Sequence, residues 1–174
     1  MKASVFIGTS LDGFIARENG DLDWLPKPSG SEDYGYEEFA ATVDAIVMGR
    51  NTYEKVLTFG EWPYPKKPLI VLSHAPLTIP AQLTSVETMS GSPAEIVSRL
   101  SKRGLKHLYI DGGKTIQGFL ETGLINELTI TRVPVLIGRG IPLFGPLQQD
   151  VLLRHIETRQ FSDGLVQSRY VVVR

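Results

Sequence analysis

The stretch that decides the fold is Ala45-Ile46-Val47-Met48-Gly49-Arg50-Asn51-Thr52-Tyr53-Glu54. It begins as a run of apolar residues, breaks at Gly49 and continues with residues that can start a helix. A continuous apolar run of this length is typical of a strand buried on both faces of a mainly parallel sheet. A strand that passes through glycine into a helix presents free backbone N–H groups at the positive end of the helix dipole, which favours an anion.

Two side chains strengthen the prediction of an anion site at this junction. Arg50 adds a cation and Thr52 a hydroxyl donor, and both suit a phosphate group. The alternative interpretation is an ordinary strand-to-helix turn with an arginine on the surface. This segment by itself does not decide between the two.

The same alternation recurs along the chain. Further apolar runs, each ending at glycine or a polar residue, predict strands at Val5–Ile7, Leu69–Leu72 and Leu108–Ile110. Helices are expected at Asp33–Thr42, Thr52–Leu57 and Lys114–Glu121. Ser92-Pro93-Ala94-Glu95 predicts another helix start, because it combines a serine cap, proline at the first helical position and glutamate three residues after the cap.

After Gly123 the alternation of predicted strands and helices ends, and the predicted elements are strands. Glu127–Ile137 is predicted to be a long strand, and His155–Phe161 and Leu165–Val173 a hairpin around residues 162–164. The proline-rich stretch 62–68 is predicted to be a loop. The expected fold is therefore α/β: a mainly parallel central sheet with flanking helices and a C-terminal antiparallel hairpin, formed by one domain over residues 1–174.

Composition excludes several classes of function. The chain has 174 residues, a net charge of −1 and no cysteine. These values exclude disulfides and thiolate metal sites, and they argue against a nucleic acid or membrane partner. A cytoplasmic location is expected. No metal site is predicted either, because His74, His107 and His155 lack the spacing of metal ligands.

A second glycine junction, Asp111-Gly112-Gly113-Lys114-Thr115, follows the predicted strand 108–110. Paired glycines let a ligand approach the backbone closely, and the next helix again offers its N-terminus. Two known nucleotide-binding motifs do not fit. A P-loop requires glycine where Leu108 stands, and the dinucleotide fingerprint requires glycine at position 114. The junction is therefore predicted to favour phosphate without matching either motif.

The segment before the first junction carries aromatic and acidic residues. Tyr34, Tyr36 and Phe39 have loosely helical spacing, which is typical of residues in a core or in the wall of a binding site. Asp33, Glu37 and Glu38 would ordinarily form the solvated face of such a helix.

Taken in order, these segments resemble the dihydrofolate reductase fold. They resemble more closely the reductase domain of the bifunctional deaminase-reductase of riboflavin biosynthesis and its stand-alone relatives. The motifs that carry the resemblance, which spans Val5 to Val172, are residues 10–16, 47–54, 110–113 and 134–144. The resemblance implies a three-layer fold, an NADPH cofactor, a small-molecule substrate and a homodimer that pairs through the C-terminal strands.

The resemblance also implies a cofactor site on the two junctions. The residues expected to hold the pyrophosphate and the 2′-phosphate are Gly49, Arg50, Asn51 and Thr52. Those expected on the opposite side of the pyrophosphate are Gly112, Gly113, Lys114 and Thr115. Ser73 and His74 are expected beside the adenosine ribose. Gly8, Ile15 and Ala16 are expected to border the nicotinamide, with the loop 13–24 closing over it.

On the substrate side the resemblance leaves alternatives open. It implies a carboxylate that contacts the substrate or relays a proton, and Asp12, Asp33 and Glu37 are the candidates, the last two following an insertion at 27–31. The implied activity is hydride transfer to a C=O or C=N of a pyrimidine- or pterin-related molecule, as in 5-amino-6-(5-phosphoribosylamino)uracil reductase. The alternatives are a dihydrofolate reductase proper and a non-catalytic NADPH-binding regulatory protein.

Overall fold

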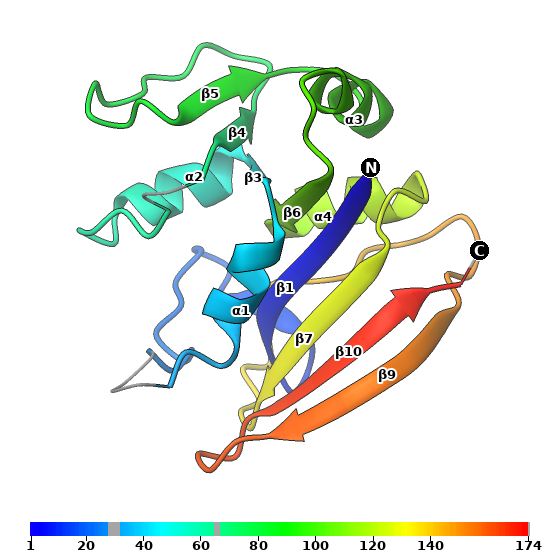
Figure 1. Ribbon diagram of the computed structural model, residues 1–174. Coiled ribbons are helices and arrows are strands. Elements are labelled where there is room, and N and C mark those ends of the chain that lie inside the picture. Colours follow the sequence, from blue (N-terminus) through cyan, green and yellow to red (C-terminus); the bar gives the residue numbers. More distant parts are fainter. Residues whose placement is uncertain (28–31, 65–66, 174) are drawn as a thin grey trace.

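An eight-stranded sheet organises the molecule, in the order β5-β4-β3-β6-β1-β7-β10-β9 (Figure 1). The computed structural model describes residues 1–27, 32–64 and 67–173. The strands of this sheet are β1 Lys2–Ser10, β3 Ala45–Gly49, β4 Leu69–Leu72, β5 Val86–Met89, β6 His107–Asp111, β7 Glu127–Val133, β9 Leu153–Gln160 and β10 Val166–Val172. The helices are α1 Tyr36–Thr42, α2 Arg50–Leu57, α3 Pro93–Lys102 and α4 Gly113–Glu121. A small second sheet pairs β2 Phe14–Ala16 with β8 Ile141–Pro142.

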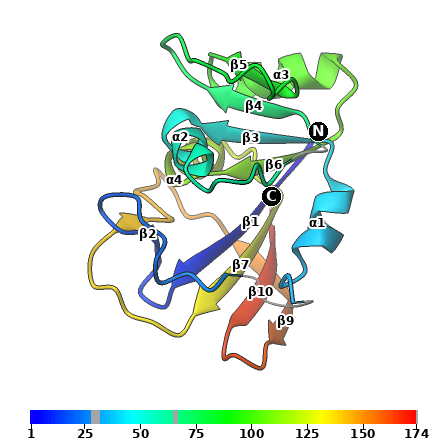
Figure 2. The ribbon, with the colours of Figure 1, turned by 90° about the vertical axis from the view of Figure 1, so that its left-hand side faces the viewer.

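In the described part of the eight-stranded sheet, the neighbouring strands β5, β4, β3, β6, β1 and β7 run parallel, and the β7–β10 and β10–β9 pairs are antiparallel. Figure 2 shows the sheet twisting from β5 at the top to β9 at the bottom. The continuous apolar runs form the interior strands, where Val5, Val47 and Ile110 are all fully buried. The predicted α/β class, with a mainly parallel sheet and a C-terminal hairpin, is confirmed.

Helices cover both faces of the sheet. Tyr53 and Val56 of α2, together with Tyr36 and Phe39 of α1, belong to the core on one face. Residues of α3 and α4, including Phe119, belong to the core on the other face. The molecule therefore has three layers, as expected. No helix in the described part of the chain is long and apolar enough to cross a membrane.

Several predicted boundaries are wrong for identifiable reasons. The first helix starts at Tyr36 instead of Asp33, because the Asp33 carboxylate accepts hydrogen bonds from the backbone N–H groups of Gly35 and Glu37 before the helix begins. The strand β7 ends at Val133 instead of continuing to 137, because Pro134 has no N–H to continue the ladder. The helix α2 starts two residues earlier than predicted, at Arg50.

The remaining differences are smaller. The hairpin strands are 153–160 and 166–172, each shifted slightly from its predicted range. The short strands β2, β5 and β8 were not predicted. In the proline-rich stretch, residues 65–66 lie outside the described part of the chain, as do residues 28–31 of the insertion. The strand β9 forms an edge of the sheet, and the expected homodimer through this edge remains a prediction.

The helix α3 begins with the capping box that the sequence predicts. The backbone N–H of Glu95 donates to the Ser92 hydroxyl at 3.4 Å, and the backbone N–H of Ser92 donates to the Glu95 carboxylate at 2.7 Å. We expect Ser92→Ala to lower the free energy of unfolding by about 1 kcal/mol in urea denaturation. Ser98→Ala, on the exposed side of the same helix, is the control and should change it by less than about 0.5 kcal/mol. Equal effects of the two variants would contradict the capping role.

Candidate active site

The two glycine junctions meet at the carboxyl edge of the sheet. The strands β3 and β6 are neighbours, with Met48 opposite Asp111, and they lead into α2 and α4. Each glycine faces a threonine of the other junction. A Cβ atom on Gly112 would lie 2.3 Å from Thr52 Oγ1, and one on Gly49 would lie 3.0 Å from Thr115 Oγ1. The starts of the two helices therefore pack against each other so closely that a residue with a Cβ atom would not fit at these two positions without a shift.

Both helix starts offer hydrogen-bond donors. Neither α2 nor α4 has a side chain that caps its first turn, so the backbone N–H groups there are available to a ligand. The half-exposed Arg50 stands at the start of α2, where its Nε donates to Glu54 at 2.7 Å. Lys114 is exposed at the start of α4. Positive helix ends and two cations at one edge of a parallel sheet are suited to an anion.

The other expected cofactor residues fall at the same edge or next to it. Ser73 and His74 directly follow β4, the strand beside β3. A Cβ atom on Gly113 would lie 3.0 Å from Ile15 Cδ1, so Ile15 lies beside the second junction. Ala16 is buried in β2, and its carbonyl oxygen lies next to Gly140. Gly8 lies farther along the edge, on β1.

The loop after β2 folds over Gly8. A Cβ atom on Gly8 would lie 2.8 Å from the methyl carbon Cδ1 of Leu25. The loop is held by an ion pair between Arg17 and Asp23, and by Lys55 of α2, which donates to Asp21 at 2.8 Å. The neighbouring Trp24 has a buried indole N–H without a hydrogen-bond partner in the described part of the chain. A buried donor of this kind is suited to a ligand.

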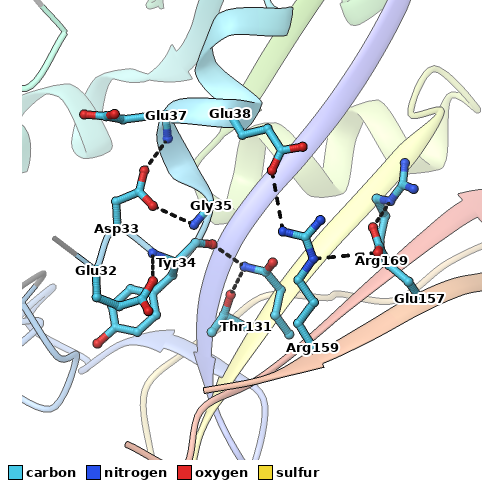
Figure 3. Close-up of polar contacts among 11 residues, drawn as sticks. Glu32, Asp33, Tyr34, Gly35, Glu37, Glu38, Thr131, Glu157, Arg159 and Arg169 are labelled. Atoms are coloured by element: carbon cyan, nitrogen blue, oxygen red, sulfur yellow. Dashed lines mark hydrogen bonds and ion pairs between the residues drawn. The ribbon is translucent and has the colours of Figure 1, made fainter. Parts of the chain in front are cut away.

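The three carboxylates expected on the substrate side are not brought together. Asp12 accepts backbone hydrogen bonds from Ile137 and Gly138, at 3.3 and 2.8 Å. A hydrogen bond from Ser10 holds the pKa of Asp12 below its ordinary value, with smaller contributions from the two backbone groups. Asp33 caps the start of α1, where hydrogen bonds from the backbone of Glu37 and then Gly35 lower its pKa (Figure 3). Figure 3 shows the exposed Glu37 carboxyl pointing away from the neighbouring residues.

Tyr34 faces the C-terminal hairpin instead of the active site. Its hydroxyl donates to Asp163 at 2.6 Å. Its carbonyl accepts a hydrogen bond from Gln167, which also donates to Thr131 (Figure 3). The backbone of Tyr34 has a φ of 55°, an uncommon conformation that these contacts hold in place. The hairpin therefore fixes the start of α1.

Asp111 is the carboxyl group that begins the second junction, and the sequence did not single it out as a catalytic residue. It ends β6 on the same sheet face as Tyr109, because alternate residues of a strand share a face. Burial raises the pKa of the Asp111 carboxyl to about 6, against hydrogen bonds from the backbone of Gly112 and from the Tyr64 hydroxyl, which lower it. In the sequence, the one signal that could have identified Asp111 as a functional residue was its place between a buried strand and two glycines.

Three tyrosines from distant segments lie near Asp111, whose charge contributes to the shifts of their pKa values: Tyr36, Tyr64 and Tyr109. Phe6 packs against Tyr36 and Phe39 against Tyr109. We call these five residues the aromatic wall. The ring centroids of Phe6 and Phe39 are 4.9 Å apart, and those of Phe39 and Tyr109 are 5.1 Å apart. Burial, followed by the Asp111 charge, raises the pKa values of Tyr36, to about 12, and of Tyr64. The expectation that Tyr36 and Phe39 line a core or a site is met by this arrangement.

A mainly parallel sheet with two converging glycine junctions and a C-terminal antiparallel hairpin places the chain in the class of dihydrofolate reductase-like folds. Within that class, residues 2–167 match the family model described as the RibD C-terminal domain. The chain belongs to this family of reductase-like domains. The resemblance stated from the sequence is thereby confirmed.

Relatives support this assignment over the full length of the chain. The chain is 38% identical to the protein YwjB of Bacillus subtilis (strain 168), over 98% of this chain and 97% of that protein. It is 43% identical to a crystal structure of a putative riboflavin biosynthesis protein from Shewanella sp. PV-4, with a TM-score of 0.93 and complete coverage of both chains. The fold also matches the deaminase/5-amino-6-(5-phosphoribosylamino)uracil reductase of Thermotoga maritima, with a TM-score of 0.75 and 16% identity over 99% of this chain and 56% of that one.

Proposed function

We propose that this protein is an NADPH-dependent reductase that transfers a hydride to a C=O or C=N bond of a pyrimidine- or pterin-related small molecule. The observation that carries the proposal is the meeting of two uncapped helix starts with a partly buried carboxyl at one edge of the sheet. The two helix starts suit a cofactor that carries a pyrophosphate. The carboxyl suits a substrate that takes up a proton during reduction. The cytoplasm is the location proposed for this activity.

The cofactor would lie across the two junctions. The backbone N–H groups at the starts of α2 and α4 would bind the pyrophosphate, with the Thr52 hydroxyl beside them. Arg50 and His74 would face the 2′-phosphate and ribose. The segment around Gly8 and Ile15 would border the nicotinamide, and the loop that carries Trp24 and Leu25 would exclude water. When bound, NADPH supplies the hydride.

Asp111 is the residue that we expect to supply the proton. Reduction of a C=O or C=N bond adds a hydride to carbon and requires a proton on the oxygen or nitrogen. Because burial raises its pKa to about 6, a useful fraction of Asp111 is protonated near neutral pH. The carboxylic acid would donate its proton to the heteroatom, and water would protonate the carboxylate again. Asp12 and Asp33 have structural partners instead, and Glu37 is exposed. The catalytic role of these three carboxyl groups stays a prediction.

The cofactor site is tested most simply at Arg50. We expect Arg50→Ala to weaken NADPH binding by about 10- to 100-fold in calorimetric titration, because a hydrogen bond between charged groups contributes roughly 1.5–3 kcal/mol. Arg103→Ala is the matched control. Arg103 is also a half-exposed arginine paired with a glutamate, Glu87, and it lies after α3. Unchanged NADPH affinity in Arg50→Ala, or equal losses in both variants, would contradict the assignment.

A dihydrofolate reductase proper is a second candidate function. Over 113 residues the chain is 26% identical to the dihydrofolate reductase HdrB of Haloferax volcanii, a match that covers 64% of this chain and 56% of that protein. Oxidation of NADPH with dihydrofolate would support this candidate. Binding of NADPH without its oxidation by any carbonyl, pyrimidine or pterin compound would instead support a regulatory protein.

A further inference from the structure

The helix α1 carries two residues of the aromatic wall, Tyr36 and Phe39. Their rings pack on Phe6 of β1 and Tyr109 of β6, with centroid distances from 4.9 to 6.5 Å. The helix has seven residues, and none of these seven is fully buried. A helix of this length is not stable by itself in water. The position of the two rings therefore depends on the contacts that hold the ends of α1.

The C-terminal end of α1 is tied to the amino edge of the sheet. Nδ1 of His107, the first residue of β6, donates to the Thr42 carbonyl at 2.9 Å. Nζ of Lys67 donates to the Val43 carbonyl at 2.6 Å. His107 is itself held by β1, because its Nε2 lies 2.8 Å from the Ser4 hydroxyl. These contacts fix one end of the helix at the edge opposite to the two glycine junctions.

The N-terminal end of α1 is fixed by one buried amide. Nε2 of Gln167, on β10, donates to the Tyr34 carbonyl and to the Thr131 hydroxyl, each at 2.9 Å (Figure 3). An amide nitrogen has two hydrogens, so both are used. Thr131 lies opposite Gln167 in the ladder between β7 and β10. The amide therefore joins the chain at the start of α1 to two strands of the sheet.

The backbone that enters α1 has a conformation that needs support. Tyr34 has a φ of 55°, and Gly35 has a φ of 81°. A residue with a Cβ atom keeps a positive φ only where the surrounding contacts impose it. The turn of the C-terminal hairpin adds two such contacts: Asp163 accepts from the Tyr34 hydroxyl at 2.6 Å, and the Phe161 ring packs edge-to-face on the Tyr34 ring. Together with the Gln167 amide, the hairpin determines where the helix begins.

We propose that Gln167, together with the Tyr34 backbone that it holds, positions α1 and thereby sets the affinity of the reductase for its substrate. The inference rests on the proposed function, which places the substrate beside Asp111 and hence beside Tyr36 of the aromatic wall. The strands β1 and β7 separate β10 from β6, the nearer of the two strands that lead into the glycine junctions. A change at Gln167 should therefore weaken the substrate more than the cofactor.

The main test is Gln167→Met in the whole protein, because methionine has a similar length but no N–H to donate. Kinetics with 5-amino-6-(5-phosphoribosylamino)uracil and with dihydrofolate measure KM and kcat for each compound that is reduced. We expect KM to rise at least about fivefold, because a displaced wall loses binding to substrate and transition state alike, while kcat stays within about threefold. The Kd of NADPH should stay within about twofold.

Hydrogen exchange measures the position of α1 without any substrate. In Gln167→Met we expect the amides of residues 34–42 to exchange at least about fivefold faster, and those of α4 to be unchanged. Ser168→Ala is the matched control. Ser168 is the next residue of β10, its side chain lies on the other face of the sheet, and its hydroxyl is 2.9 Å from Thr158 Oγ1. This control disturbs the hairpin but should change neither KM nor the exchange of α1.

Tyr34→Phe provides a second variant if Gln167→Met fails to fold. It removes only the hydroxyl that donates to Asp163 on the surface, and it should raise KM and the exchange of residues 34–42 by at least about twofold. An unchanged exchange rate or an unchanged KM in the folded variant would overturn the inference. Equal effects in Ser168→Ala, or a loss of NADPH affinity as large as the rise in KM, would overturn it as well.

The two proposals fail in different ways. If the unaltered protein does not bind NADPH, the proposed function is rejected, and faster exchange confined to residues 34–42 in Gln167→Met would still support the positioning of α1. If the protein reduces either compound with NADPH but KM is the same in Gln167→Met, this inference is rejected and the proposed function is kept.

Discussion

Asp111→Asn is expected to lower the rate of substrate reduction at saturating NADPH by about 100-fold or more, because a positioned general acid contributes typically 10²–10⁴-fold. The asparagine keeps the shape of the side chain but has no proton of suitable acidity to donate. NADPH affinity should stay within about threefold, because the amide replaces only the side chain beside the junction. Single-turnover oxidation of bound NADPH measures the rate apart from cofactor binding.

The same substitution is expected to stabilise the folded protein near neutral pH. The folded-state pKa of Asp111, about 6, lies above the ordinary value of 3.8, so the folded state loses stability as pH rises through that interval. The asparagine cannot ionise, so the variant does not bear the cost of a buried carboxylate. Its unfolding free energy should exceed that of the unaltered protein by about 2 kcal/mol at about pH 7.5, and by almost nothing at about pH 4. Urea denaturation at the two pH values measures the difference.

Asp44→Asn is a control of opposite sign. Asp44 accepts hydrogen bonds from the backbone N–H groups of Lys106 and His107, at 2.7 and 2.8 Å, and these hold its pKa below 3.8. Its stabilising contribution is present above the ordinary pKa and is lost as pH falls through the lowered one. Replacement of Asp44 should therefore cost stability near neutral pH.

Full activity of Asp111→Asn, or a loss of stability of Asp111→Asn near neutral pH, would contradict the role of Asp111.

Gly112→Ala is expected to have the second large effect. Gly112 has a φ of 88°, which strains any residue with a Cβ atom, and that atom would lie 2.3 Å from Thr52 Oγ1. The starts of α2 and α4 must then separate. We expect a loss of about 3 kcal/mol in unfolding free energy, and NADPH affinity lower by at least about tenfold.

Gly60→Ala separates the two causes of this loss. Gly60 also has a positive φ, 86°, but a Cβ atom there would meet no atom within 4 Å. Its replacement should cost only about 1 kcal/mol, from backbone strain, and leave NADPH affinity unchanged. If Gly112→Ala behaved like Gly60→Ala in both measurements, the close packing of the two junctions would have no role in cofactor binding.

Both glycine junctions could be predicted from the sequence because their signals are local. An apolar run, a glycine and a helix start lie within ten residues of Ala45, and the same is true around Asp111. That the two junctions pack glycine against threonine follows from the strand order, which no local pattern contains. The order puts β3 beside β6 although the strands are far apart in the chain.

The carboxyl that we propose as the proton donor was harder to predict for a related reason. The chemistry of Asp111 depends on burial among Tyr36, Tyr64 and Tyr109, which come from three separate segments. The sequence favoured Asp33 as a candidate and not Asp111, since an acid at a helix start and an acid in a site have the same local pattern. The structure distinguishes them, because the backbone at the start of α1 already occupies the Asp33 carboxylate.

A crystal structure of the protein with bound NADPH would show directly whether the two junctions hold the cofactor. The pyrophosphate is expected at the starts of α2 and α4, within hydrogen-bond distance of backbone N–H groups of both helices. The nicotinamide ring is expected between Gly8 and the aromatic wall, beside Asp111. A pyrophosphate bound elsewhere, or a nicotinamide ring remote from Asp111, would contradict the proposed site.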